Sequence, residues 1–119
     1  MNVIFTLKVP AEGIEEKTAI RNVNDRNDFS FVDAAGCACH VQIFENGIIF
    51  VRKAQDHMLE LHAHGQKYVM ICSPEGNFRI EMKVVEFIFN NDILVMRYQI
   101  DKDDREIEIR YLQELKEAQ

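Results

Sequence analysis

Cysteine and histidine recur two residues apart at two places in the chain, Cys37-Ala38-Cys39 and His62-Ala63-His64. Residues two apart share one face of a β-strand, so each pair could present two metal ligands, and together they would supply a Cys2His2 set for zinc. Structural zinc motifs more often space their cysteines C-x2-C, and His64 precedes a turn glycine. We therefore interpret the cysteines as small, partly buried side chains and the histidines as a solvated strand end, and we expect no metal and no cofactor.

A second chemical candidate is Arg52, which ends an apolar run. An arginine that points into a small barrel needs a carboxylate or an anionic ligand, because an unpaired buried charge is costly. The ligand-binding hypothesis is that Arg52 fixes the acid head of a small amphipathic molecule, with Tyr68 and Tyr98 supplying polar contacts. The alternative is an arginine at the barrel rim, paired with Glu60 or Glu81, and the general exposure of arginine favours it.

Motifs for catalysis are missing from the sequence, which has no G-x-S-x-G, no P-loop and no G-x-G-x-x-G. Its two serines, Ser30 and Ser73, lack the context of a nucleophile elbow. A Cys39–His62 dyad stays open, although no local pattern supports it. The acidic turn at 101–104 lacks the glycine and the terminal glutamate of a calcium loop. We therefore expect a protein that is not an enzyme.

The composition is that of one globular domain, residues 1–119, with enough apolar side chains for a core without staples. A net charge of −6 argues against nonspecific binding to nucleic acid or to an anionic membrane, because both need a basic surface. An acidic surface suits a basic protein partner, which is the alternative to a small ligand. The N-terminal segment lacks the features of a signal peptide, and three cysteines suit a reducing compartment, so we expect a cytoplasmic protein.

These side chains are positioned by about nine predicted β-strands joined by short turns, with a short helix possible over 112–119. Alternation of apolar and polar residues is clearest at 106–111 and is present at 2–9. Between 78 and 89 the apolar parity switches at Val84-Val85, which predicts a β-bulge or a sharp bend. Sequential hairpins favour an antiparallel meander that closes into an up-and-down barrel, because closure removes exposed edges. The predicted core contains Phe5, Leu7, Phe50, Leu61, Ile80, Met82, Leu94, Met96, Ile107 and Ile109.

The strongest turn signal is Asn46-Gly47, which lies between two apolar runs. Asn-Gly favours a type I′ turn, in which both central residues have positive φ. Such a turn would place Phe44 opposite Ile49 and Ile43 opposite Phe50, an apolar pair on each face of the hairpin.

Several short motifs resemble the uncharacterised YwiB-like family of bacterial domains of unknown function. They are the run GIIFVRKAQDHMLELHAHG, the turn SPEG at 73–76, the strand FRIEM and Tyr98-Gln99-Ile100. The family pattern is occupied here by Arg52, Met58, Leu61, Pro74, Gly76 and Tyr98. The resemblance covers residues 29–111, with Ala54, Ser73 and Glu75 as departures from the pattern. It implies a calycin barrel, similar to the lipocalins, and it brings no established activity.

Overall fold

The computed structural model describes residues 1–112 and contains ten strands in one antiparallel sheet, against the predicted number of about nine. The strands are β1 (Asn2–Val9), β2 (Ile14–Ile20), β3 (Asp28–Val32), β4 (Ala38–Phe44), β5 (Gly47–Lys53), β6 (Met58–His62), β7 (Tyr68–Ser73), β8 (Gly76–Phe89), β9 (Ile93–Ile100) and β10 (Asp103–Leu112), with a 3-10 turn, η1 (Pro10–Glu12). Within residues 1–112, no helix has the length and apolar character needed to span a membrane. The helix predicted over 112–119 lies outside the described residues, except for Leu112, which ends β10.

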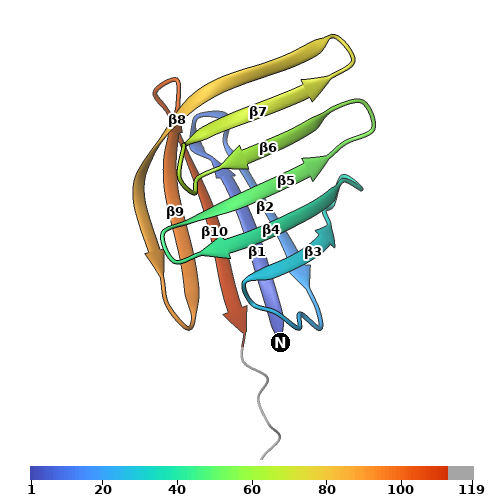
Figure 1. Ribbon diagram of the computed structural model, residues 1–119. Helices are drawn as coiled ribbons and strands as arrows, with labels where there is room; N and C mark the ends of the chain where they lie inside the picture. Colours follow the sequence, from blue (N-terminus) through green and yellow to red (C-terminus); the bar gives the residue numbers. More distant parts are fainter. Residues whose placement is uncertain (113–119) are drawn as a thin grey trace, which may run out of the picture.

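The strands form the predicted up-and-down barrel, which is nearly closed. Their order is β2-β1-β10-β9-β8-β7-β6-β5-β4-β3, so each strand pairs with its neighbour in sequence except where β1 pairs with β10. No strand pairing joins β2 to β3, the two ends of this order. Figure 1 shows β3 to β7 lying across β1, β2, β9 and β10 at a steep angle. The barrel is therefore flattened into two layers of strands with a core between them.

The long strand β8 joins the two layers. Its residues 76–81 pair with β7, whereas residues 82–89 pair with β9. We call β3–β7 with residues 76–81 the front sheet, and residues 82–89 with β9, β10, β1 and β2 the back sheet. The β8–β9 register shifts between Val84 and Glu86, so Val85 is an extra, exposed residue. The bulge predicted from the parity switch is confirmed.

Side chains from both sheets fill the space between them. Phe5 of β1 stacks on Phe50 of β5 with ring centroids 5.1 Å apart and meets Phe31 of β3 at 5.0 Å. Eight of the ten predicted core residues are buried, whereas Leu7 and Ile80 are only partly buried. The largest fully buried side chains are Ile48, Leu94, Met96, Ile107, Ile109, Val3 and Val41.

The β4–β5 hairpin differs from the predicted one. Its turn residues are Glu45-Asn46. Phe44 therefore lies opposite Gly47 and not Ile49, and Ile43 lies opposite Ile48 and not Phe50. Both predicted pairs are wrong by two residues. Neither Asn46 nor Gly47 has positive φ. A shift of two residues leaves every side chain on the face where it was expected, because the side-chain period of a strand is two.

Gly47 is required because a Cβ has no room at this position, and not because its φ is positive. A Cβ on Gly47 would lie 1.9 Å from the carbonyl oxygen of Ala63, so only glycine fits. A two-residue turn with positive φ occurs instead between β9 and β10, where Asp101 has φ 55° and Lys102 has φ 72°. The backbone of this hairpin matches the type I′ geometry that we predicted for the other one.

Candidate functional site

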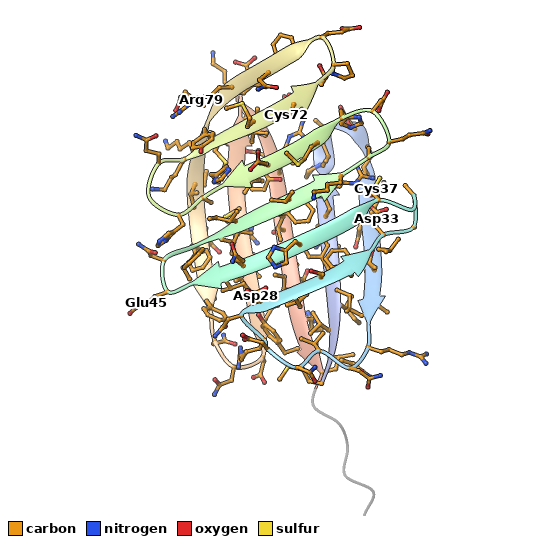
Figure 2. All side chains as sticks on the ribbon, turned by 45° about the vertical axis from the view of Figure 1, so that its right-hand side comes forward. Asp28, Asp33, Cys37, Glu45, Cys72 and Arg79 are labelled. Carbon is orange, nitrogen blue, oxygen red and sulfur yellow. The ribbon has the colours of Figure 1, made fainter. Side chains whose placement is uncertain are left out.

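Arg52 points into the barrel. It shares the inward parity of Ile48 and Phe50 in β5, both of which are buried. Its Nε donates a hydrogen bond to Asp33 Oδ2 at 2.7 Å, in an ion pair whose side chains are 28% and 11% exposed. Asp33 follows β3 directly, and it lies close to Cys37 at one end of the front sheet (Figure 2). The partner of Arg52 is therefore Asp33, not the Glu60 or Glu81 of the rim alternative.

Asp33 also holds the turn that follows β3. Its Oδ1 accepts hydrogen bonds from the backbone N–H groups of Ala35 at 3.0 Å and Cys37 at 2.9 Å. Burial alone would raise the pKa of the Asp33 carboxyl, but the Cys37 N–H and the Arg52 guanidinium outweigh it and lower the pKa. The sequence carried a signal for this turn, because aspartate before Ala-Ala-Gly is typical of a side chain that caps its own turn.

Little space remains beside Arg52. The cavity next to it holds about 10 Å³, enough for about one water molecule. It is lined by Phe5, Leu7, Glu16, Thr18, Phe31, Asp33, Cys39, Phe50 and Arg52. Two of these residues are carboxylates and one is a guanidinium, so the local charge is net negative. This arrangement holds Arg52 in place but disfavours a further anion inside the barrel.

The two tyrosines of the ligand-binding hypothesis do not meet Arg52. Tyr68 lies on the outer side of the front sheet, because its neighbour Val69 points inward and is buried. There its ring stacks on His62 with centroids 4.5 Å apart and lies 4.1 Å from the guanidinium of Arg79. Figure 2 shows Arg79 on the front sheet, far from the end that carries Asp33.

Tyr98 belongs to the core of the back sheet. It is 3% exposed, and burial raises its pKa to about 12. Its cross-strand neighbours are Val84 and Arg105. Arg105 also points inward, and its buried Nε has no hydrogen-bond partner within residues 1–112. Sequence patterning did not single out this arginine, because it precedes the clean alternation of β10.

The cysteines at the end of the front sheet, Cys37 and Cys39, are buried. Cys39 points inward, and burial, followed by the charge of Asp33, raises the pKa of its thiol to about 12. A thiol with this pKa is protonated at neutral pH and is a poor nucleophile. Cys37, Cys39 and Cys72 all carry free thiols.

The histidines lie on the opposite side of the front sheet from Cys39. His62 points outward from β6, since Leu61 beside it is buried, and its ring stacks on Tyr68. His64 stacks on Phe44 with ring centroids 4.0 Å apart, and its Nδ1 lies 3.0 Å from Asn46 Oδ1. Within residues 1–112, no group of three or more His, Cys, Asp or Glu side chains is placed to hold a metal. The Cys/His pairs and the Cys39–His62 dyad are not brought together.

The outer side of the back sheet carries a group of ion pairs beside the apolar Ile4, Ile88 and Val95. Lys8 Nζ lies 3.1 Å from a carboxylate oxygen of Glu106 and 3.3 Å from one of Glu108. Arg97 contacts Glu106 at 2.9 Å, and Arg110 contacts Glu108 at 3.0 Å. Neighbouring strands thus present charges of alternating sign, which is typical of a surface that remains in water.

The outer side of the front sheet, which we call the front face, has a different composition. Its outward positions include Val32, which is 63% exposed, and the partly buried Ile49, Val51, Met58 and Met70. A hollow of about 440 Å³ lies over β3, β4 and β5. It is lined by Ser30, Phe31, Val32, Ala38, Cys39, His40, Val51 and Lys53.

The sequence signal for this face was the unbroken apolar run at 48–51. A strand that is apolar at successive positions has apolar side chains on both faces and is typical of strands covered on both sides. In the front sheet only the inner side is covered within residues 1–112, by the back sheet. The candidate functional site is therefore the front face. The Arg52–Asp33 ion pair lies on the inner side of the same sheet and holds the turn that follows β3.

Comparison with known proteins gives a distant structural likeness and no family. No family model matches the chain, and no curated protein matches it. Among solved structures, the crystal structure of the YwiB protein from Bacillus subtilis matches with 10% sequence identity and a TM-score of 0.34. The match covers 94% of this chain and 89% of that chain. A likeness this distant carries no conclusion about function.

Proposed function

We propose that this protein is a non-enzymatic binding module that holds a basic protein partner on its front face. The observation that carries the proposal is the hollow with apolar lining on the front face. The back sheet carries ion pairs beside the exposed Val85 and Ile88, whereas on the front face Val32 and Val51 line a hollow of about 440 Å³. An exposed apolar patch with a polar rim is the usual mark of a protein-binding surface.

The charges around the front face favour a basic partner. The strands and turns of the front sheet carry six carboxylates on or beside the face, against three lysine or arginine side chains. The carboxylates are Asp28, Glu45, Asp56, Glu60, Glu75 and Glu81, and the cations are Lys53, Lys67 and Arg79. Complementary charge at the rim of an interface accelerates association and excludes acidic proteins. Binding should therefore weaken as the salt concentration rises.

Site-specific photo-crosslinking in cells tests this proposal. A photoreactive amino acid at Val51 or Met70 reports contacts of the front face, and one at Gln99 on the outer side of the back sheet is the matched control. We expect one basic protein to be captured from both front positions and not from the control, and Val51→Lys to abolish capture from Met70. Equal capture from all three positions, or capture only of acidic proteins, would contradict the proposal.

Three further statements belong to the proposal. The barrel is calycin-like, supported by its antiparallel meander of ten strands. It does no catalysis, supported by the protonated, buried thiol of Cys39 and by histidines that lie away from it. It acts in the cytoplasm, supported by three free cysteines.

A second candidate function is the binding of a small amphipathic anion at the barrel mouth. One inward-facing arginine favours it: Arg105 lies beside Tyr98 and leaves its buried Nε unpaired within residues 1–112, whereas Arg52 is already paired with Asp33. Thermal shift with fatty-acid-like anions tests it. A shift in the wild type that is lost in Arg52→Ala or Arg105→Ala supports this function, and equal shifts in all three proteins exclude it.

A further inference from the structure

The barrel has three strand edges without a pairing partner within residues 1–112. They are β2, β3 and the first part of β8, residues 76–81. Exposed edges attract other strands, and proteins usually blunt them with charged residues, above all with charges that point inward. The edges of this barrel differ in that protection.

Two of the edges, β2 and residues 76–81 of β8, carry charged side chains. β2 contains Glu15, Glu16 and Lys17, and Glu16 points inward because it lies opposite Leu7 of β1. The edge of β8 carries Arg79 and Glu81, which pair with each other at 3.1 Å. Both edges are therefore costly to pair with another strand.

The edge of β3 lacks this protection. Between residues 29 and 32 its sequence is Phe-Ser-Phe-Val, with no charge, no proline and no bulge. Asp28 precedes this stretch and is paired with His40 at 2.6 Å. Val32 is 63% exposed at the other end. A neutral, regular edge of this kind is suited to pairing with another strand.

The backbone of β3 also offers free hydrogen-bonding groups. The carbonyl of Asn27 accepts a bond from Ile43 N at 2.7 Å, and the N–H of Asp33 donates to Cys37 O at 3.0 Å, so the odd-numbered residues face β4. Backbone groups alternate in direction along an antiparallel strand. Ser30 and Val32 therefore direct their N–H and C=O groups toward the unpaired side.

We propose that a second copy of this chain pairs with β3 in antiparallel orientation, giving a two-fold dimer with a front sheet continuous across both copies. The symmetric register is centred on Ser30, so Ser30 of each copy bonds to Ser30 of the other. This register places Phe29 opposite Phe31 of the second copy on the inner side, twice. A register centred on Phe31 would instead place Phe29 opposite Asp33, which is already bonded to Arg52.

A second copy is an acceptable partner despite the acidic chain. Each copy carries a net charge of −6, but the one charge in the paired segment 28–32 is Asp28, which lies opposite Val32 of the other copy and is already paired with His40 at 2.6 Å, so repulsion acts mainly at longer range. Added salt screens such repulsion, and the dimer should strengthen as salt is added. The two hollows would lie on the same side of the joined sheet, because a two-fold axis perpendicular to a sheet preserves its faces.

Light scattering and sedimentation of the full chain over a range of concentrations test the dimer. Ser30→Pro removes only the donor that points to the free edge, and Val32→Glu places a second carboxylate opposite Asp28 of the other copy, where like charges repel. Val85→Glu is the matched control, because Val85 is similarly exposed, at 56% against 63%, but lies in the β8 bulge of the back sheet. A thermal melt of each variant shows that it remains folded.

We expect a concentration-dependent dimer for the wild type and for Val85→Glu. Ser30→Pro deletes two intermolecular hydrogen bonds per dimer, so its dissociation constant should rise roughly thirtyfold. Val32→Glu should be monomeric, because its carboxylate would lie opposite Asp28 of the other copy. A wild type that stays monomeric up to its solubility limit, or a dimer that survives both β3 variants, would overturn the inference. The dimer does not depend on the proposed partner: its affinity rises with salt, whereas binding of a basic protein falls.

Discussion

Replacing Arg52 and Asp33 separates a structural role for the guanidinium from a ligand-binding one. If the ion pair exists to hold the end of the front sheet, each substitution lowers stability, and the two losses are coupled. If Arg52 is kept for a ligand, its removal changes stability little. Arg52→Met is the appropriate first variant because it retains the apolar stem that packs beside Phe50.

The magnitude follows from the contacts of each side chain. A hydrogen bond to a charged group contributes about 1.5–3 kcal/mol, and partial exposure of the pair places Arg52→Met near the lower end, about 1.5 kcal/mol. Asp33→Ala removes the same bond and also the acceptor for the N–H groups of Ala35 and Cys37. At about 1 kcal/mol for each of those two bonds, its cost is about 3–4 kcal/mol. The double variant should be no less stable than Asp33→Ala, which gives a coupling energy of about 1.5 kcal/mol.

Urea denaturation at neutral pH and low salt measures all four proteins. Asp33→Asn is a useful addition, because it keeps an oxygen for the turn but loses the charge. Its cost should fall between those of Arg52→Met and Asp33→Ala. A loss below about 0.5 kcal/mol for Arg52→Met, together with additive effects in the double variant, would refute the structural role. The small-anion function would then gain support.

Three other predictions concern stability. Gly47→Ala should cost at least about 3 kcal/mol in urea denaturation, because its Cβ would lie 1.9 Å from Ala63 O. Gly65→Ala, where φ is +76° and the surrounding space is open, should cost about 1 kcal/mol. Equal losses of stability in the two variants would disprove the steric explanation. The pKa of Cys39 is raised from 9.0 to about 12, so stability should fall as pH rises from 9 toward 12, and Cys39→Ala should remove part of that decline in melts over this range. The pKa of Asp33 is lowered from 3.8, so its contribution is complete above that pH and is lost as pH falls through the lower folded value; an unchanged acid transition in Asp33→Asn would contradict this.

The fold was predictable from sequence because its signals are local. Alternation at 106–111 fixes one buried and one wet face of β10, and Ile107 and Ile109 are fully buried as expected. The parity switch at Val84-Val85 located the bulge, since a strand that changes its apolar face needs an extra residue. Neither inference requires knowledge of which strand lies beside which.

The errors lie where distant segments meet. Asn46-Gly47 resembles a type I′ turn, but the glycine is needed because the backbone of Ala63 approaches it. The partner of Arg52 is 19 residues away in sequence, and no local pattern selects Asp33 over other carboxylates. Tyr68 was grouped with Arg52 by residue type, although Arg52 shares the inward parity of buried Phe50 whereas Tyr68 alternates with buried Val69. Strand parity is a property of the sequence, and it is sufficient to place this tyrosine and this arginine on opposite sides of the sheet.

The packing of the barrel supports the proposal that a partner binds on its front face. The core is packed by the chain's own side chains, and the space beside Arg52 is about 10 Å³. The outer side of the back sheet carries ion pairs, although Val85 and Ile88 are also exposed there. The run at 48–51 gives β5 apolar side chains on both faces, and the front face is covered by no strand of residues 1–112. Since leaving apolar area in water carries a free-energy cost of roughly 25 cal/mol per Å², we expect the front face to be covered by a partner.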